Sequence, residues 1–221
     1  MLKKIASHIK RLSRPAEYFS SKEYWENRYN QTGNSGSGSY NHLAIFKAEI
    51  LNEIFVQNNI NSVIEFGCGD GNQLSLLNCK NYIGLDVSLS AIGLCKKKFE
   101  NDNTKNFFLY DHRGFVDNQK IFQQDCSISL DVLYHLVEKE VYEAYLKHLF
   151  ASAKKRVVIY AADQNIEQLT KHELYRQFTK DIEKNIEGWK LEKFIKNKYP
   201  AKNYEDQEGS LADFFIYEPV Q

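Results

Sequence analysis

The sequence lacks an excess of charge of either sign, because 29 Lys and Arg residues balance 29 Asp and Glu residues. A protein that grips nucleic acid mainly through phosphates carries a basic excess. Nucleic acid is therefore not expected as a partner, although this composition still allows a local basic patch. The chain also lacks an apolar run long enough to span a bilayer, so no membrane-spanning segment is predicted.

Paired cysteine motifs and metal-binding clusters are also missing. No C-x-x-C pair occurs among the four cysteines, which are Cys68, Cys79, Cys95 and Cys126. A zinc or redox motif is therefore not indicated, and a reducing, cytoplasmic environment is expected. No group of His and carboxylate residues has metal-ligand spacing, so no metal is predicted. The absence of a 20–50-residue repeat excludes a solenoid.

The first residues are basic and weakly amphipathic. Residues 1–14 (MLKKIASHIKRLSR) place apolar side chains at helical spacing between Lys and Arg, without the continuous apolar stretch of a signal peptide. The pattern fits a helix that rests weakly on an anionic membrane surface, on the inner face of the membrane, or on a partner. A terminal helix that frays or packs on the chain itself is the favoured alternative. We expect an arm over residues 1–20 and one domain over residues 21–221.

Within that domain, short apolar runs alternate with amphipathic segments. The alternation predicts a mainly parallel sheet covered by helices on both faces, with residues 21–60 as a helical cap. The predicted strands are residues 62–66, 82–85, 106–110, 127–130, 156–161, 189–195 and 212–217, and the predicted helices are residues 18–29, 42–56, 72–77, 90–100, 138–152 and 172–182.

A glycine-rich loop follows the first predicted strand, in VIEFGCGDGNQ at residues 63–73. Glycines allow a sharp turn and a close approach of a ligand at the carboxyl end of a strand. The second strand ends at Asp86, where a carboxylate can accept both ribose hydroxyls. The acids Glu65 and Asp70 would repel a pyrophosphate but not a sulfonium with an amino group, which favours S-adenosylmethionine over a nicotinamide dinucleotide.

The segments VIEFGCGDG, GLDVS and LDVLYHL resemble motifs of the class I S-adenosylmethionine-dependent methyltransferase family. The resemblance runs from about residue 62 to the C-terminus. It implies an α/β fold with a Rossmann-like, mostly parallel seven-stranded sheet whose last strand is antiparallel. With YWENRY, SGSGS, FGCGDGNQL, DHRGF, KYP and ADFFIY added, the chain is similar to a bacterial subgroup associated with surface (capsular) polysaccharide gene clusters.

The resemblance also implies which residues bind S-adenosylmethionine and leave S-adenosylhomocysteine as the product. The implied contacts are Glu65, Gly67, Gly69 and Gly71 on the methionine side, with Cys68 and Gln73 in the same loop, Asp86 at the ribose, Val87 and Ser88 beside the adenine, Asp111 and His112 at the adenine amino group, and Asp131 facing the methyl group. A helix N-cap is an equal alternative for Asp131. Cys68 fits a small loop residue without a role in binding.

Two residues of the cap join this set. Tyr24 and Arg28 precede the Gly/Ser-rich stretch at residues 32–39, and we expect this region to close over the cofactor, with Arg28 meeting the methionine carboxylate. A flexible linker is the usual alternative for such a composition.

For the methyl transfer itself, His135 is the first candidate base, because imidazole can take a proton from a hydroxyl near neutral pH. A structural histidine bonded to a backbone carbonyl fits the same position. His172 and Arg176 lie four residues apart on a predicted helix and would then share a face. Arg176 could hold a phosphate or carboxylate together with Lys198, and a phosphoryl or phosphoramidate acceptor would need no base. A solvated helix face is the alternative for this pair.

The leading functional hypothesis is O-methylation of a small acceptor, either a sugar or a phosphorylated molecule, in surface-glycan assembly. Methylation of RNA or protein is less favoured, because the charge is balanced and DVLYH differs from the N-P-P-Y type of motif. A nicotinamide-dependent oxidoreductase or a cofactor-binding module without catalysis would also contain a glycine loop followed by an acidic strand end. The sequence predicts no oligomeric state.

Overall fold

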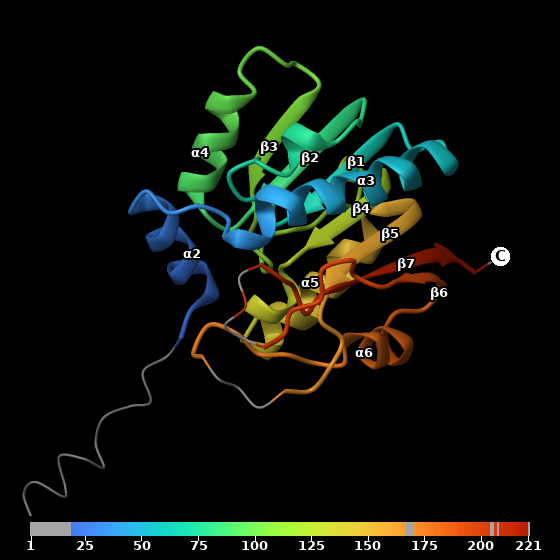
Figure 1. The fold of residues 1–221 in the computed structure, drawn as a ribbon. Helices are drawn as coiled ribbons and strands as arrows, with labels where there is room; N and C mark the ends of the chain where they lie inside the picture. Colours follow the sequence, from blue (N-terminus) through green and yellow to red (C-terminus); the bar gives the residue numbers. More distant parts are fainter. Residues whose placement is uncertain (1–18, 167–169, 204–205, 207, 221) are drawn as a thin grey trace, which may run out of the picture.

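The computed structural model describes residues 19–166, 170–203, 206 and 208–220, and the predicted basic arm lies almost wholly outside them. A sheet of seven strands crosses the molecule in the order β3-β2-β1-β4-β5-β7-β6 (Figure 1). The strands are β1 Ser62–Phe66, β2 Asn81–Asp86, β3 Lys105–Leu109, β4 Gln124–Leu130, β5 Ala153–Ala161, β6 Trp189–Ile195 and β7 Asp213–Pro219. The helices are α2 Ser21–Asn30, α3 Asn41–Gln57, α4 Leu89–Lys98, α5 Lys139–Ala151 and α6 Phe178–Asn185, with short 3-10 turns η1 Ser37–Ser39, η2 Leu74–Leu76 and η3 Leu133–His135.

The sheet confirms the expected Rossmann-like fold. Strands β1 to β5 pair in parallel, whereas β7 runs antiparallel to both of its neighbours, β5 and β6. The strand order reverses between β1 and β4, which are neighbours in the sheet but not in the sequence. Open α/β sheets bind ligands at such a reversal, outside the carboxyl ends of the strands.

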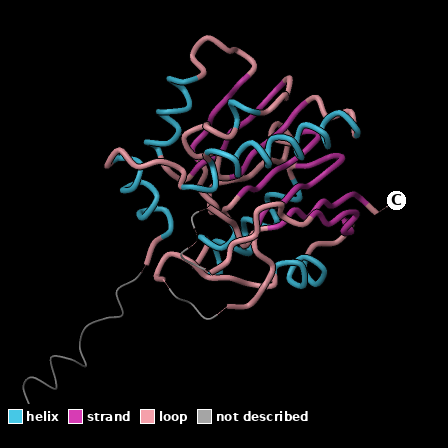
Figure 2. Tube along the Cα trace, viewed as in Figure 1, coloured by secondary structure: helices cyan, strands magenta, loops and turns pink. Residues whose placement is uncertain are grey.

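Helices cover both faces of the sheet, as Figure 2 shows, because the strands are apolar on both sides. Val63 and Ile64 are both fully buried and belong to different hydrophobic clusters. The first cluster packs α3 and α4 on one face, and the second packs α5 and α6 on the other. Among the described residues no helix combines the length and the apolar character needed to cross a bilayer.

The helix predicted at residues 72–77 is wrong, because the chain forms only the 3-10 turn η2 there. β1 ends at Phe66 and β2 begins at Asn81, so the connection is short. The glycine loop occupies its first half, which leaves too few residues for a regular helix before β2.

The helix predicted at residues 172–182 begins only at Phe178 and continues to Asn185. The segment before it is extended, with isolated bridges between Thr170 and Glu173 and between Asp163 and Arg176. Asp163 accepts hydrogen bonds from the backbone N–H and the hydroxyl of Thr179, which fixes the first turn of α6 there. His172 and Arg176 therefore do not share a helical face.

Candidate functional site

A cavity of about 350 Å³ lies at the carboxyl ends of the strands, where the strand order reverses. Its volume falls within the range of about 300–1,000 Å³ that small-molecule sites occupy. Most of the residues that the sequence singled out line it, and these are Glu65, Gly67, Cys68, Gly69, Gln73, Asp86, Val87, Asp111, His112, Asp131 and His135. The lining does not include the other residues singled out, which are Tyr24, Arg28, Gly71, Ser88, His172, Arg176 and Lys198.

The glycine loop turns in a way that only glycine allows without strain. Gly67 and Gly69 both have positive φ angles, of 83° and 56°. A Cβ on Gly67 would lie 2.5 Å from a methyl group of Val132, and one on Gly69 would overlap the hydroxyl of Ser35. The bare backbone of this loop therefore forms one wall of the cavity.

Asp86, at the end of β2, is hydrogen-bonded to the glycine loop. Its two carboxylate oxygens accept hydrogen bonds from the backbone N–H groups of Gly69 and Ser88, each at 2.9 Å. Burial raises the pKa of Asp86 to about 6, against the effect of these hydrogen bonds. Because each oxygen has a further lone pair, the carboxylate can still accept a pair of hydroxyl groups from the cavity.

Glu65 is the second buried acid in the lining. It is 2% exposed and accepts a hydrogen bond from the hydroxyl of Tyr82. Burial raises the pKa of Glu65 to about 7, while Tyr82 and the ammonium of Lys47 lower it in part. A cation placed in the cavity would relieve this penalty by pairing with the carboxylate.

Gln73 offers an acceptor that nothing in the described residues satisfies. Its amide nitrogen donates to the carbonyl of Ala44 at 3.0 Å, whereas Oε1 is buried and has no hydrogen-bond partner. The side chain lines the cavity and is only 5% exposed. A buried orphan acceptor is costly unless a ligand supplies a donor, so Gln73 indicates a hydrogen-bond donor on that ligand.

The cap is tied directly to the glycine loop. The carboxylate of Asp70 accepts hydrogen bonds from the N–H of Ser35, the hydroxyl of Tyr40 and the N–H of Asn72. Although burial opposes them, these hydrogen bonds lower the pKa of Asp70. The hydroxyl of Ser35 in turn accepts from the N–H of Asp70 and bonds to the hydroxyl of Tyr29. The Gly/Ser-rich stretch is thus an ordered part of the cavity wall, not a free linker.

Helix α2 is fastened across the cavity by Glu26. Its carboxylate accepts hydrogen bonds from the hydroxyls of Ser88 and Ser90, at 2.7 and 2.6 Å, and from the N–H of Ser90. The hydroxyl of Ser88 also accepts from the N–H of Ala91 and caps α4. Ser88 therefore serves the junction between α2 and α4, while its backbone supports Asp86.

The two predicted cap contacts lie outside the cavity lining. Tyr24 stacks on the ring of His172, with centroids 4.6 Å apart. Arg28 donates from Nε to the carbonyl of Asn34 at 2.8 Å, and its guanidinium lies over the ring of Trp25. In this arrangement Arg28 orders the cap loop instead of pointing at a ligand.

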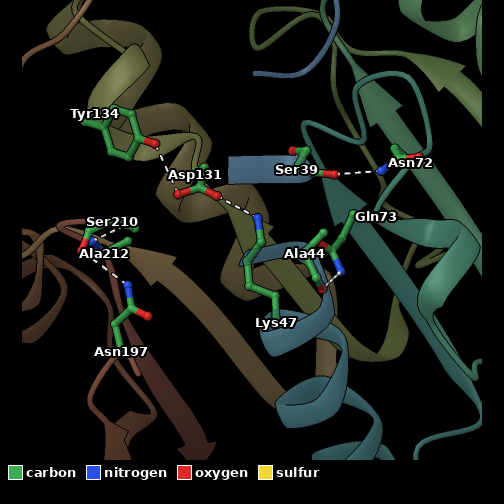
Figure 3. A network of polar contacts seen from close by, with 10 residues as sticks. All are labelled: Ser39, Ala44, Lys47, Asn72, Gln73, Asp131, Tyr134, Asn197, Ser210 and Ala212. Atoms are coloured by element: carbon green, nitrogen blue, oxygen red, sulfur yellow. Dashed lines mark hydrogen bonds and ion pairs between the residues drawn. The ribbon is translucent and has the colours of Figure 1, made fainter. Parts of the chain in front are cut away.

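Asp131 joins the end of β4 to the cap through a buried ion pair, drawn in Figure 3. The ammonium of Lys47, on α3, is 0% exposed and lies 2.6 Å from Oδ2 of Asp131. The hydroxyl of Tyr134 donates to the other oxygen at 3.1 Å. No side chain caps η3, so Asp131 does not act as the N-cap that its position also allowed.

Other polar contacts in Figure 3 hold the same region together. Asn72 and Gln73, next to the glycine loop, donate to the carbonyls of Ser39 and Ala44 in the cap. Asn197 donates to the carbonyl of Ser210 across the loop between β6 and β7. The end of β4 therefore lies among three segments that are distant in the sequence.

His135 is partly buried beside Trp25, with the two rings edge to face at 4.9 Å. Its Nδ1 bonds to the carbonyl of His172 at 3.2 Å. A carbonyl can only accept, so Nδ1 carries the proton and Nε2 keeps a free lone pair. Burial lowers the pKa of His135 to about 4, which leaves the ring neutral near pH 7. The residue thus makes the contact of a structural histidine and still presents an acceptor nitrogen.

The three basic groups proposed for an anionic acceptor are engaged elsewhere. Arg176 donates to the carbonyls of Leu136 and Val137, at 2.8 and 2.9 Å, and its guanidinium covers the ring of Tyr142. The ring of His172 is stacked between other rings. The ammonium of Lys198 lies over the ring of its neighbour Tyr199. The expected cationic cluster does not form.

Asp111 and His112 also line the cavity, and exposed basic side chains lie beside Asp111. Asp111 lies in ion pairs with Lys22 and Arg113, at 3.6 and 3.7 Å, and His112 follows it in the lining. The hydrogen bond from the N–H of Arg113 is the largest influence that lowers the pKa of Asp111. The described residues contain no group of three or more His, Cys, Asp or Glu side chains that could hold a metal ion.

Trp25, Tyr29 and Ser35 line the cavity from the cap, within the region that was expected to close over the cofactor, although none of them was named as a contact. Lys47, which pairs with Asp131, was not predicted from the sequence. The one available signal for Lys47 was a lysine on the otherwise apolar face of the helix at residues 42–56, among the buried Leu43, Phe46 and Leu51. Such a position predicts a buried partner of opposite charge.

Comparisons with known proteins agree with this geometry. The model of a family described as "Methyltransferase domain" matches residues 8–207. None of the curated protein sequences compared with the chain matches it.

Solved structures share the fold at low sequence identity. N-methyltransferase NodS from Bradyrhizobium japonicum WM9, crystallised with S-adenosyl-L-homocysteine, has a TM-score of 0.68 and 14% identity, covering 92% of this chain and 100% of NodS. Magnesium protoporphyrin IX methyltransferase from Synechocystis PCC 6803, with bound SAM, has a TM-score of 0.63 and 16% identity, covering 93% and 100% of the two chains. The methyltransferase domain of bacterial CtHen1 has a TM-score of 0.60 and 20% identity, covering 80% and 98%.

Proposed function

Because the chain belongs to the methyltransferase-domain family, we propose that it transfers a methyl group from S-adenosylmethionine to a hydroxyl of a small acceptor. The observation that carries the proposal is the cavity between the glycine loop and Asp86. Solved structures of the same fold hold S-adenosylmethionine or S-adenosylhomocysteine. The cofactor supplies an activated methyl group on a positively charged sulfur.

The residues of the cavity fit that cofactor. Asp86 has lone pairs for the two ribose hydroxyls, and the orphan Oε1 of Gln73 offers an acceptor for the ammonium of the methionine part. Glu65 and Asp86 are acidic groups of the lining, which favours a ligand that carries a sulfonium and an ammonium. The same carboxylates would repel a pyrophosphate, so a dinucleotide fits this lining less well.

The chain's own part in the reaction is to align the groups and exclude water. In the transfer the acceptor oxygen forms a bond to the methyl carbon while the bond from that carbon to sulfur breaks, and the electron pair stays on sulfur. Trp25 and the cap shield the cavity, which favours the displacement by positioning and desolvation. Nε2 of His135, unprotonated in its tautomer, accepts the proton of the hydroxyl.

The acceptor is proposed to belong to surface-glycan assembly on the cytoplasmic side of the membrane. The support for this finer assignment is the resemblance of segments such as YWENRY, DHRGF and ADFFIY to the polysaccharide-associated subgroup. A phosphorylated or phosphoramidate acceptor is less favoured than a sugar, because Arg176 is bound to backbone carbonyls.

Calorimetry separates this proposal from a dinucleotide-dependent activity. S-adenosylhomocysteine should bind with one site per chain, and NAD should show no binding heat under the same conditions. Release of S-adenosylhomocysteine from S-adenosylmethionine in the presence of candidate sugars then tests turnover. Binding of NAD in preference to S-adenosylhomocysteine would refute the proposal, and cofactor binding without transfer to any acceptor would favour a binding module.

A further inference from the structure

A second cavity, of about 120 Å³, adjoins the cofactor cavity at the end of β4. Asp131 lies in the lining of both cavities. The turn η1 also lies between them, since Ser39 faces the cofactor cavity while Ser37 and Gly38 line the second one. Asp131, which was predicted to face the methyl group, therefore lies where the two cavities meet.

The lining of the second cavity is acidic. Asp131, Glu173 and Asp206 contribute carboxyl groups, and no Lys, Arg or His belongs to the described lining. Lys47 approaches from outside the lining, and its ammonium is committed to Asp131 at 2.6 Å. Backbone N–H groups of residues 202 and 208 hold Asp206 and lower its pKa, so this group stays ionised. Even with the ammonium of Lys47 paired to Asp131, the lining itself holds carboxyl groups and no basic side chain, so it disfavours an anion.

Two aromatic rings and several polar groups complete the wall. Tyr134 and Tyr175 both line the cavity and stack in parallel, with centroids 5.2 Å apart and planes 14° apart. Asn203 and Ser210 add an amide and a hydroxyl to the lining. Carboxylates and amides that accept from hydroxyl groups, next to an aromatic surface that packs on C–H groups, are the chemistry that recognises a sugar ring.

We propose that this second cavity binds the methyl acceptor, and that the acceptor is an unphosphorylated sugar, neutral or carrying an amino group. This rests on the function proposed above and narrows it by excluding the phosphorylated class. The cavity has the volume of roughly four water molecules in the liquid. That space suits the hydroxyl-bearing edge of one ring, and the hydroxyl nearest Asp131 is the one that reaches the methyl group.

Binding to the protein saturated with S-adenosylhomocysteine tests the proposal, with four probes measured by calorimetry or ligand-detected NMR. The probes are glucose, glucosamine, glucose 6-phosphate and glucosamine 6-phosphate. We expect each phosphorylated sugar to bind at least about tenfold more weakly than its unphosphorylated counterpart, since like charges face each other. Equal or tighter binding of the phosphates, or no detectable binding of either unphosphorylated sugar, overturns the proposal.

Variants of Glu173 test whether the preference for unphosphorylated sugars arises in the second cavity. Glu173→Gln should weaken glucosamine binding, and Glu173→Lys should reverse the preference toward the 6-phosphates, while both leave the affinity for S-adenosylhomocysteine unchanged. Glu187→Gln, at an exposed position outside the cavity lining, is the matched control and should change nothing. An unchanged preference in Glu173→Lys contradicts the assignment of the cavity. Failure of the wild-type chain to bind S-adenosylhomocysteine would instead remove the proposed function itself, and this proposal with it.

Discussion

At the scale of single residues, Asp86 is the side chain on which cofactor binding should depend most. It combines burial, two backbone hydrogen bonds and free lone pairs toward the cavity. Asp86→Ala removes the acceptor for the ribose hydroxyls as well as support for the N–H of Gly69. Because a hydrogen bond to a charged group contributes about 1.5–3 kcal/mol, we expect binding of S-adenosylhomocysteine to weaken by about ten- to a hundredfold or more, measured by calorimetry.

The matched control for this variant is Asp111→Ala. Asp111 also lines the cavity but is partly exposed and paired with surface cations, so its removal should weaken binding much less. Thermal unfolding of both variants checks that each is folded. An unchanged dissociation constant in a folded Asp86→Ala protein would rule out the assigned site.

The raised pKa values of Glu65 and Asp86 make cofactor binding depend on pH. Burial raises them to about 7 and about 6, so both groups take up protons in the empty cavity below these values. Since the cationic cofactor favours their ionised forms, the affinity for S-adenosylmethionine should rise between about pH 5 and pH 7.5, with release of protons. Calorimetry in buffers of different ionisation enthalpy measures that release.

Glu65→Gln should flatten the upper part of the pH dependence of the affinity for S-adenosylmethionine. In the wild-type chain without cofactor, the folded-state pKa of Glu65 lies above its unfolded value, so its contribution to stability is lost as the pH rises through about 7. Between about pH 5 and pH 7.5 the variant should therefore lose less stability than the wild type, as measured by denaturant titrations. Identical binding profiles for the two proteins would show that Glu65 does not titrate in the cavity.

His135 should affect turnover more than binding. Its Nδ1 holds the carbonyl of His172, and the neutral ring offers only Nε2 to the cavity. His135→Ala should lower kcat by about 10²-fold at most, the lower end of the usual contribution of a base, because a pKa of about 4 makes Nε2 a weak base, and it should change the affinity for S-adenosylhomocysteine little. Unchanged methyl transfer in this variant would leave His135 with the structural role alone.

At the scale of elements, helix α2 depends on one carboxylate for its position over the cavity. Glu26 accepts three hydrogen bonds from Ser88 and Ser90, at the start of α4. Glu26→Ala should release α2, weaken cofactor binding by about tenfold, and increase hydrogen exchange over residues 21–30. The fold of the sheet should be unaffected, as measured by circular dichroism.

Glu23→Ala is the control on the same helix. Its carboxylate makes no hydrogen bond or ion pair within the described part of the chain, where only its N–H is bonded to Ser20. The variant should leave cofactor affinity and exchange near the wild-type values. Equal effects of the two substitutions would mean that general loss of helix stability, not the contact with α4, determines binding.

The elements that could be predicted from the sequence are those whose apolar pattern alone determines them. Strand β1 and helix α3 were predicted to within a residue, because burial against the sheet sets their ends. β4 and β5 begin three residues earlier than predicted, where polar residues still pair in the sheet. The extended segment at 172–177 was missed because its conformation depends on distant groups, such as the carbonyl of Tyr134 that bonds Leu174.

The residues of the candidate site also fall into those that could be predicted from the sequence and those that could not. The glycine loop and Asp86 are local in the sequence and were predicted correctly as neighbours in one cavity. The contacts of Arg176 and Lys47 could not be predicted, since each pairs with a group that is dozens of residues away. Periodicity says which face of an element is apolar, but it does not say which distant polar group a buried cation will meet.

At the scale of the whole molecule, the cap and the sheet are joined at their centre by a single buried ion pair within the described part of the chain. Lys47 comes from α3 and Asp131 from the end of β4, and the ammonium is completely buried. The other contacts between cap and sheet are the apolar packing of α3 and hydrogen bonds such as that of Ser35 with Asp70. The pair therefore couples the position of the cap to the residue that separates the two cavities.

Breaking this pair should be costly. Lys47→Met keeps the length of the side chain but leaves the carboxylate of Asp131, whose side chain is 14% exposed, without its cation. Removal of one partner of a buried pair costs about 3–5 kcal/mol. We expect that loss in the free energy of unfolding from urea titrations, together with a fall in kcat, because Asp131 no longer has a fixed position. The double variant Lys47→Met, Asp131→Asn should recover part of the stability but not the activity, since the carboxylate between the cavities is gone. If Lys47→Met unfolded within about 0.5 kcal/mol of the wild type, the change typical of a surface substitution, the apolar packing of α3 and the other hydrogen bonds would hold the cap instead.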